Sequence, residues 1–517
     1  MMIPMWAPPL TPIGNIAISF IIAIIPIVTL MVLLIVVKLP SHEVTLISSI
    51  VTVIIAVTIY RMPIRLALSS YLYGVLYGLW PISWIVINAM ILLNLAEEAS
   101  SIKRLEEWML RNILGGDIMR ILFVAFLFGS LVEGIDGFGF PIAIASALLV
   151  RLGFSPLSSV LVALLANTIT VPYASLGVPV LTLSIVTELD FHLLTTYVAL
   201  QLIPFSLLIP LLMIVKTMGR KEVGKALDAI LLSGLTLGIM VYLIARYVNP
   251  YLAGILGPMI SMVVIALYNR LRYRRSRNIR RMSFSEALYG WLPWIYVVSL
   301  MIIFLMLDLT RIFTLKVEIP FLHRQIYIEL YGRYYSAVYE WAPLAHGTIV
   351  LIATLLTAIT FGIKVNRFMS IAHNTIRNLK GAILTIIMVV GMSFLMNYSG
   401  ISITIGYALS SLKSIYPFMA VLIGWLGTFI TGSCTGSNAL FGNLQRISAE
   451  ILGISPYVTT TANVTGGVLG KIVSLQSIAI GTSAVGLFGK EGEVMRELLP
   501  YSLALTLILS VLVFLQS

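Results

Sequence analysis

Charged residues lie inside stretches of this chain that are otherwise apolar. Glu133 and Asp136 stand in EGIDGFGFPIA (133–143), and Lys471 stands near the midpoint of the apolar segment 457–488. A lysine at the centre of a membrane helix costs about 2.5–3.5 kcal/mol, and here both ends of the segment are too far for its ammonium group to reach water. Two interpretations stay open for Lys471. It is the countercharge for a carboxylate substrate, or it forms a structural ion pair with Glu133 or Asp136.

Amides and hydroxyls accompany these charges. Asn167, Asn463 and Gln476 lie near glycine and proline in apolar segments, where an amide can bind a ligand or satisfy broken backbone. We predict a set of substrate-binding residues: Lys471, Asn167, Asn463, Ser437, Asn438, Gln476, Ser433 and Thr435. Because a carboxylate withdrawn from water favours its protonated form, Glu133 and Asp136 are the candidates for proton coupling.

The composition identifies the environment of these residues. Of the 517 residues, 59% are hydrophobic and 10% are charged, whereas soluble domains carry about 25% charged residues. Several apolar runs reach the roughly 20 residues that a helix needs to cross a bilayer. The sequence therefore predicts an all-α polytopic protein of the cell membrane, embedded in the lipid bilayer.

Composition also argues against other classes of protein. The chain has one cysteine, Cys434, and five scattered histidines without metal-ligand spacing. We expect no metal, no cofactor and no enzymatic activity, since a membrane hydrolase would need a base beside its nucleophile. The net charge of +12 comes largely from short loops, above all NRLRYRRSRNIRR (269–281). Such loops mark the cytoplasmic side rather than a nucleic-acid surface.

Apolar runs predict membrane spans near 15–37, 42–60, 78–96, 190–215, 228–247, 251–268, 287–306, 345–363, 381–397 and 498–516. Residues 64–77 are either interfacial or part of a bent span. The basic loops 216–225 and 364–380 lie two spans before and two spans after the arginine-rich loop. Because two crossings return a chain to the same side, all three loops are predicted to be cytoplasmic.

Two stretches of the chain resemble each other. GFSPLSSVLVALLANTITVPYASLGVPV (153–180) and GISPYVTTTANVTGGVLGKIVSLQSIAI (453–480) share a G-[FI]-S-P start and an Ala-Asn pair. Each is predicted to be a broken transmembrane helix, interrupted at Pro172, Gly177, Gly466, Gly467 and Gly470. The charge pattern places 153–156 inside and 453–456 outside. We therefore expect the inverted-topology repeats of a secondary transporter.

Each repeat has a second interrupted segment upstream. The 12 residues between Arg120 and Glu133 cover about 18 Å as a helix, less than the roughly 30 Å of hydrocarbon. We predict a re-entrant hairpin that turns near mid-depth at Gly134, Gly137 and Gly139, with Pro141 in the first turn of the returning half-helix. The free N–H groups of that half-helix form an anion site. A second hairpin, with its tip at 432–438, is predicted to enter from the opposite side.

These same residues resemble the L-lactate permease family of proton-coupled carboxylate transporters. The stretches that carry the resemblance are 73–89, 128–156, 164–180, 424–445 and 462–491. The resemblance covers nearly the whole chain and implies symport of a proton with lactate or a similar 2-hydroxy monocarboxylate such as glycolate. Residues that match the family's motifs are Glu133, Asn167, Ser437, Asn438, Asn463, Lys471 and Gln476.

Both hairpin tips depart from the family pattern. Asp136 stands where the family's EGAAGFGTP has alanine, and Cys434 stands where its GSDTSSN has aspartate; Phe140 and Gly436 also differ from their counterparts. One carboxylate is thus lost from one tip, and another is gained in the opposite tip. Asp136 either replaces the lost aspartate in function or caps the half-helix that begins near Phe140.

The expected organisation has five parts: N-terminal transmembrane helices (1–118), first hairpin and broken helix (119–186), linking helices (187–380), second hairpin and broken helix (381–488), and a C-terminal helix (489–517). The alternative function is a sodium-coupled or dicarboxylate carrier. A dicarboxylate substrate would need two cationic side chains deep in the membrane, and Lys471 supplies one. The expected partners are the small carboxylate substrate, protons and lipid, with no nucleic acid. A homodimer stays open.

Overall fold

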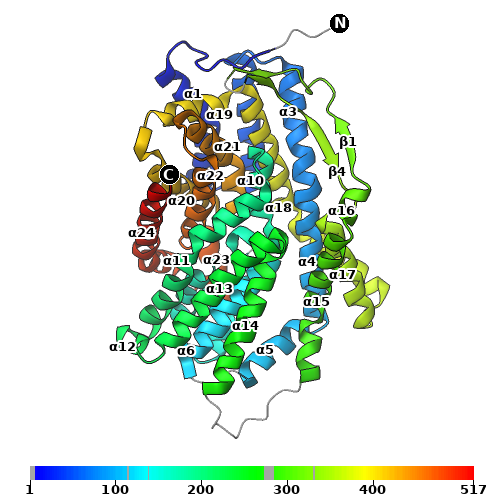
Figure 1. Cartoon of the computed structure of the whole chain (residues 1–517), viewed down its shortest axis with the longest axis vertical. Helices are drawn as coiled ribbons and strands as arrows, with labels where there is room; N and C mark the ends of the chain where they lie inside the picture. The colour runs from blue at the N-terminus through cyan, green and yellow to red at the C-terminus, as the bar shows by residue number, and fades with distance from the viewer. Residues whose placement is uncertain (1–5, 113–115, 138, 273–283, 330–331) are drawn as a thin grey trace.

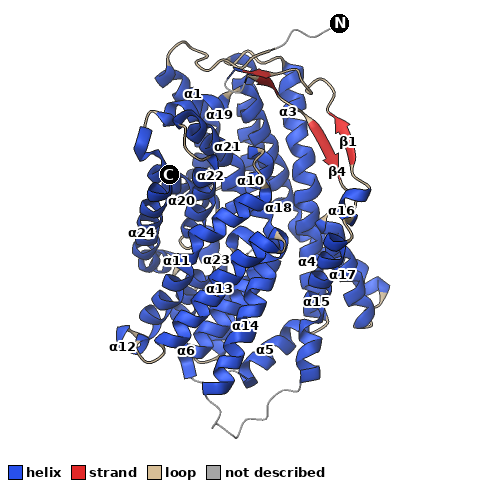
Figure 2. Ribbon diagram, in the orientation of Figure 1, coloured by secondary structure: helices blue, strands red, loops and turns tan. Residues whose placement is uncertain are grey.

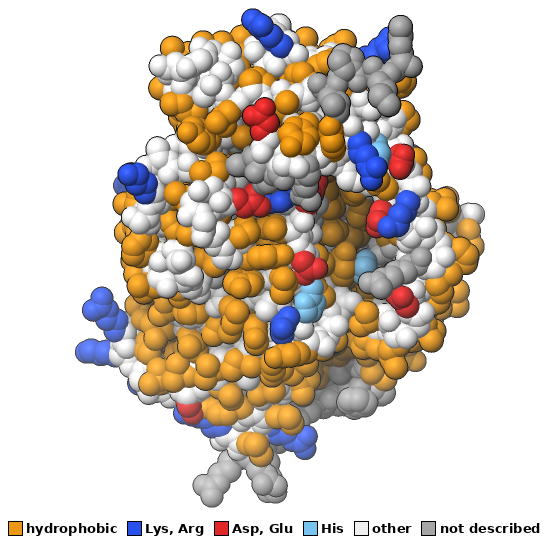
Figure 3. Space-filling model, turned by 45° about the horizontal axis from the view of Figure 1, so that its top comes forward, with side chains coloured by type: hydrophobic (Ala, Val, Ile, Leu, Met, Phe, Trp, Pro, Cys, Tyr) orange, Lys and Arg blue, Asp and Glu red, His pale blue; other side chains and the backbone are white. Residues whose placement is uncertain are grey.

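A bundle of long apolar helices makes up the protein. The computed structural model describes residues 6–112, 116–137, 139–272, 284–329 and 332–517, and Figures 1 and 2 show them almost entirely helical. Within these residues, 12 helical segments are long and apolar enough to cross a membrane, or up to 13 if a bent pair counts as one span. Hydrophobic side chains cover most of the face in Figure 3. The prediction of an all-α polytopic membrane protein is confirmed.

The first spans form one side of the bundle. They are α1 (Ile16–Val32) with η1 (Leu33–Val37), α2 (Ser41–Thr58), α3 (Ile64–Tyr77), η2 (Gly78–Ser83) and α4 (Trp84–Glu98). The segments from Ile64 to Glu98 form one 35-residue helical span. Residues 64–77 are thus part of a bent span, one of the two predicted alternatives, and the separate span predicted to start at residue 78 was wrong. Pro81 removes a backbone donor, and Trp80 before it has non-helical φ and ψ of −138° and 121°, so the span is kinked at this point.

A helical hairpin follows the amphipathic helix α5 (Ser101–Asn112). Its first arm joins α6 (Gly116–Arg120), η3 (Ile121–Phe128) and α7 (Gly129–Ile135), and its second arm is α8 (Phe140–Arg151). The first arm has 20 residues and is long enough to cross by length alone, so the 12-residue estimate was too short. The helix begins before Arg120, whose guanidinium pairs with Asp117 in the first turn, and it continues past the buried Glu133.

The turn of this hairpin confirms three of the four predicted residues. Gly137 and Gly139 have φ of +80° and +93°, a region that glycine adopts without a steric penalty. Pro141 lies in the first turn of α8. Gly134, however, is helical. A Cβ there would lie 1.9 Å from the carbonyl oxygen of Gly254, so this glycine permits close approach of α14 (Ala253–Arg272) and does not make the turn.

The first broken helix is confirmed. It consists of α9 (Pro156–Ala166), η4 (Val171–Tyr173) and α10 (Ala174–Thr187), and the axis bends by 69° at the break. Pro172 lies in η4, and Gly177 has φ of +84°.

The second hairpin and broken helix have a shorter interruption than predicted. The hairpin arms are α20 (Tyr416–Thr431) and α21 (Cys434–Leu452), with a turn at Gly432. The broken helix has α22 (Pro456–Lys471) and α23 (Leu475–Ala484), so the break follows Lys471. Thr435, Ser437 and Asn438 therefore lie in the first turns of α21, not in an open tip.

Gly466, Gly467 and Gly470 do not break the second helix, contrary to the prediction. All three lie inside α22. A Cβ at Gly466 would lie 2.1 Å from the carbonyl oxygen of Val421, and one at Gly470 would lie 2.2 Å from that of Trp425. These glycines let α20 and α22 pack backbone to backbone.

The two hairpins and two broken helices pack crosswise. The returning arm α8 contacts α23, and the arm α21 contacts α10. In Figure 1, α6 lies at the lower end of the molecule, whereas α19 (Ile401–Ser410), which leads into the second hairpin, lies at the upper end. Each hairpin thus contacts the far half of the other broken helix, an arrangement consistent with inverted repeats.

The remaining helices surround this centre. They are α11 (Phe191–Met218), α12 (Arg220–Val223), α13 (Leu227–Tyr247), η5 (Pro250–Leu252), α15 (Phe284–Met306), α16 (Leu309–Ile312), α17 (His346–Thr360), α18 (Val365–Ser399), η7 (Lys413–Ile415) and α24 (Glu491–Gln516). Four strands pair antiparallel as β1 (Leu315–Glu318) with β4 (Val338–Trp341) and β2 (Tyr327–Ile328) with β3 (Arg333–Tyr334). Of the predicted cytoplasmic loop 269–281, residues 273–281 lie outside the described part of the chain.

Candidate functional site

The centre of the site is a buried ion pair between the two repeats. Lys471 Nζ, at the end of α22, donates to Glu133 Oε1 of α7 at 2.6 Å. Glu133 is 0% exposed and Lys471 is 6% exposed. Asn167, at the break of the first helix, donates its Nδ2 to the other carboxylate oxygen at 2.6 Å. One carboxylate thus joins the first hairpin to both broken helices.

An amide network occupies the matching place in the second repeat. Asn463 Nδ2 of α22 donates to Asn438 Oδ1 of α21 at 3.0 Å. Asn438 Nδ2 in turn donates to the carbonyl oxygen of Pro179 in α10, at 2.9 Å. The Asn of each Ala-Asn pair therefore hydrogen-bonds the hairpin of its own repeat. All the side chains of this network are buried.

A cavity of about 170 Å³ lies against Lys471. Both hairpin tips and both helix breaks contribute to its wall, and residues of α1, α2 and α18 also line it. The residues that contribute polar groups are Ser41, Thr45, Ser175, Thr385, Thr431, Ser433, Thr435, Lys471, Gln476 and Ser477. Among the described residues that line the cavity, Lys471 carries the only formal charge.

Backbone dipoles add to the positive potential of this cavity. Gly139 occupies the N-cap of α8 and has no side chain to cap the helix. By contrast, the first turn of α21 is capped by its own sequence, because Ser433 Oγ accepts from the Gly436 N–H at 3.1 Å. An uncapped helix N-terminus favours an anion. The α8 end is therefore better placed than the α21 end to attract one.

The structure divides the predicted site residues into two groups. Lys471, Gln476, Ser433 and Thr435 line the cavity together. The others are buried and do not line the cavity: Asn167, Asn463, Ser437, Asn438, Glu133 and Asp136. Asp136 is buried at the end of α7, and its carbonyl oxygen accepts from the Ser175 hydroxyl.

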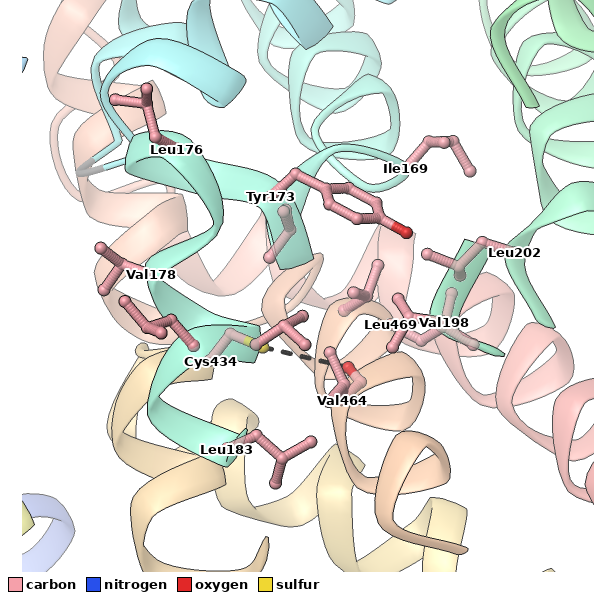
Figure 4. Close-up of a cluster of buried hydrophobic side chains, with 14 of the residues drawn as sticks. Ile169, Tyr173, Leu176, Val178, Leu183, Val198, Leu202, Cys434, Val464 and Leu469 are labelled. Atoms are coloured by element: carbon pink, nitrogen blue, oxygen red, sulfur yellow. Dashed lines mark hydrogen bonds between the residues drawn. The ribbon is translucent and has the colours of Figure 1, made fainter. Parts of the chain in front are cut away.

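Apolar packing holds the back of the site. In Figure 4 the Cys434 side chain points toward Val464 of α22, amid side chains from α10 and α11. Its sulfur lies 3.9 Å from the Val464 carbonyl oxygen. The thiol thus lies against α22 on one side and borders the cavity on the other.

The sequence alone did not predict that α2, α18 and Ser175 line the cavity. Thr45 of α2 and Thr385 of α18 belong to ordinary apolar spans, and nothing in their local sequence marks them. Ser175 and Leu176 adopt left-handed φ values of 45° and 58° without being glycine. Only the departure of this segment from helical geometry brings the Ser175 hydroxyl to the cavity.

The arrangement is suited to holding a small anion. A cation, several hydroxyls and a helix N-terminus converge on one cavity. Among the described residues, no group of three or more His, Cys, Asp or Glu side chains could hold a metal ion. The cation and the helix N-terminus are the features of the cavity that suit a small carboxylate.

Known proteins similar to this chain include permeases. The family model described as L-lactate permease matches residues 19–517. The chain is 32% identical to the glycolate permease GlcA of Escherichia coli (strain K12), over 99% of this chain and 98% of that protein. It is also 32% identical to the L-lactate permease of Bacillus subtilis (strain 168), with the same coverage. Among solved structures, it is similar to the Alcanivorax borkumensis YdaH transporter, at 15% identity and a TM-score of 0.43, over 83% of this chain and 84% of that one.

Proposed function

The chain belongs to the L-lactate permease family, and from this premise we propose that it is a proton-coupled symporter of L-lactate or a related 2-hydroxy monocarboxylate such as glycolate. It is a multi-pass transporter of the cell membrane and not an enzyme. The single observation that carries the proposal of proton coupling is the buried Lys471–Glu133 pair beside the cavity.

Charge balance links this pair to proton coupling. In the empty carrier the ammonium group of Lys471 is neutralised by Glu133. A monocarboxylate that enters the cavity adds one negative charge to a region where uncompensated charge is costly. Protonation of Glu133 removes that charge and frees Lys471 to pair with the substrate. A proton and a carboxylate then bind together and are released together.

The cavity favours a monocarboxylate over a dicarboxylate. Lys471 is the one formal charge among its described lining residues, so a second carboxylate of the substrate would have no cation to meet. The hydroxyls of Ser433 and Thr435 lie in the same wall and suit the 2-hydroxy group. Alternating access would then proceed by movement of the two hairpin-containing repeats, 119–186 and 381–488, about the shared site.

A sodium-coupled carrier is the second candidate. It is favoured by two buried oxygens at the break of the first helix, Asn167 Oδ1 and Thr170 Oγ1, which have no hydrogen-bond partner among the described residues. Broken membrane helices offer oxygens of this kind to sodium in other transporters. Proton coupling has the stronger support, because a titratable carboxylate already contacts the cation of the cavity.

Uptake into proteoliposomes separates these candidates. Labelled L-lactate and glycolate are presented with an inside-alkaline pH gradient, with a sodium gradient, or with neither. Proton symport predicts accumulation under the pH gradient and its loss when a protonophore is added. Accumulation that follows the sodium gradient alone would favour the second candidate.

A further inference from the structure

One face of α23 covers the tips of both hairpins. An ideal Cβ on Gly432 would lie 2.3 Å from Gln476 Oε1, and one on Gly139 would lie 2.3 Å from Ile480 Cδ1. Gln476 and Ile480 are four residues apart, so they lie on the same face of the helix, one turn apart. Each therefore rests on the glycine of a different hairpin.

The same two residues lie between the cavity beside Lys471 and an open groove. Both line the cavity that contains Lys471, and both line a second hollow along α8 and α23. The rest of that hollow is formed by small side chains, those of Ala143, Ala479, Ser483 and Ala484. Gln476, Ala479 and Ser483 are exposed. The groove thus begins where the cavity ends, with Gln476 and Ile480 at the junction.

This groove leads to the predicted cytoplasmic end. From the junction, α23 runs to Ala484, and α24 begins soon after it. Near the start of α24, Glu497 forms an ion pair with Lys216, which belongs to one of the basic loops predicted to be cytoplasmic. The mouth of the groove therefore lies on the side of those loops.

The opposite end of the cavity is closed by packing. Val178, Leu440 and Val389 line it there, from α10, α21 and α18. Beyond them, Ser393 of α18 donates to the carbonyl oxygen of Ala439, and Asn397 donates to that of Val186 at 3.1 Å. These contacts join all three helices at this part of the cavity wall, whereas the junction on α23 consists of two side chains.

We propose that Gln476 and Ile480 form the inner gate of the transport site, and that the bulk of Ile480 sets the size of the acid that passes. The selectivity part of this proposal rests on the proposed function; the gate itself does not. Ile480 presents an apolar side chain to the mouth and discriminates by volume, whereas Gln476 offers an amide to the polar end of the ligand. In an apolar pocket, one methylene changes selectivity by about 10-fold to 200-fold.

Cys434 provides a test of the gate that requires no transport. It is the only cysteine in the chain, it is 5% exposed, and it lines the cavity behind Ile480. The rate at which N-ethylmaleimide and the bulkier fluorescein maleimide modify the purified full-length protein is measured by mass spectrometry. Ile480→Ala should accelerate the bulky reagent several-fold more than the small one, and Ile480→Phe should slow both.

Leu475→Ala is the matched control, because Leu475 is exposed on the same helix and lines neither hollow. Ile480→Val replaces Ile480→Ala if the alanine variant does not fold. Equal acceleration in the Leu475 and Ile480 variants, or faster labelling in Ile480→Phe, would overturn the gate.

Competition of linear 2-hydroxy acids against labelled L-lactate uptake tests whether Ile480 sets the size of the acid that passes. In Ile480→Ala, the preference for lactate over the longer acids should fall by about tenfold or more. An unchanged preference overturns the size filter. Absence of all uptake by the wild-type protein would instead refute the proposed function, while the labelling rates still decide the gate.

Discussion

Lys471 Nζ lies 2.6 Å from Glu133 Oε1, although the two residues are 338 positions apart in the chain. The pair joins the first hairpin to the break of the second broken helix, beside a cavity that both repeats line. A countercharge for the substrate and a structural ion pair were alternatives at the level of sequence. The structure makes them compatible, since Lys471 contacts Glu133 and also faces the cavity.

Removal of the cation should abolish substrate binding. We expect Lys471→Ala to lose nearly all affinity for the carboxylate, because no other formal charge lines the described cavity wall. Lys471→Arg should also bind poorly, since a planar guanidinium does not fill the place of a compact ammonium group. Equilibrium binding of labelled L-lactate to the purified variants measures this. Wild-type affinity in the alanine variant would leave Lys471 with a structural role only.

The free energy of unfolding should reveal the Lys471–Glu133 ion pair independently of substrate binding. Lys471→Met alone leaves the Glu133 carboxylate buried and unpaired, which should cost about 3–5 kcal/mol in the free energy of unfolding. The double variant Lys471→Met with Glu133→Leu removes both charges and should regain most of that loss. It should nevertheless remain unable to bind the acid. Additive losses in the double variant, measured by denaturant unfolding in detergent, would contradict a direct coupling of the two residues.

Variants at Asp136 and Cys434 test whether a carboxylate in the first hairpin tip replaces the one that the second tip lacks. Gly137, next to Asp136, lines the same cavity as Cys434. If Asp136 supplies the carboxylate that the second tip lacks, Asp136→Ala should impair accumulation driven by a pH gradient, and the further change Cys434→Asp should restore part of it. In the structure Gly139, not Asp136, occupies the N-cap of α8. Normal accumulation by Asp136→Asn, with no rescue by Cys434→Asp, would assign Asp136 a structural role.

Topology can be tested at two exposed positions on opposite ends of the bundle. Lys221 lies in α12 at the lower end of Figure 1, and Ser411 follows α19 at the upper end. In a Cys434→Ala background, a cysteine at 411 should react with an impermeant thiol reagent in intact cells, whereas one at 221 should react only after permeabilisation. The reverse pattern would invert the topology and place the α23 groove outside.

The sequence predicted those features that have a local physical signal. Charge inside apolar runs identified Glu133 and Lys471, and glycine with proline located the turn at 137–141 and the first broken helix. The Ala-Asn pairs identified Asn167 and Asn463, and each hydrogen-bonds its own hairpin. These residue types are costly or conformationally unusual in a membrane, so their positions carry information.

Other features had no such signal. Glycine in a membrane helix serves a turn or a close approach equally well, and only tertiary packing shows that Gly134 and Gly466 do the latter. The side wall from α1, α2 and α18 comes from distant spans of ordinary composition. Ile480 is one apolar residue among many, and its place against Gly139 in the first hairpin tip depends on tertiary packing.

Proton movement that accompanies the substrate is the most direct measure of proton coupling. L-lactate is added outside proteoliposomes that contain a pH-sensitive dye, without an imposed pH gradient. The internal pH is followed for the wild-type protein and for Glu133→Gln. Glutamine cannot take up the proton but keeps an oxygen near Lys471. Proton symport through Glu133 predicts that lactate entry acidifies the wild-type lumen, and that Glu133→Gln exchanges labelled lactate without acidification. Lactate entry without acidification in the wild type, or undiminished acidification in Glu133→Gln, would contradict it.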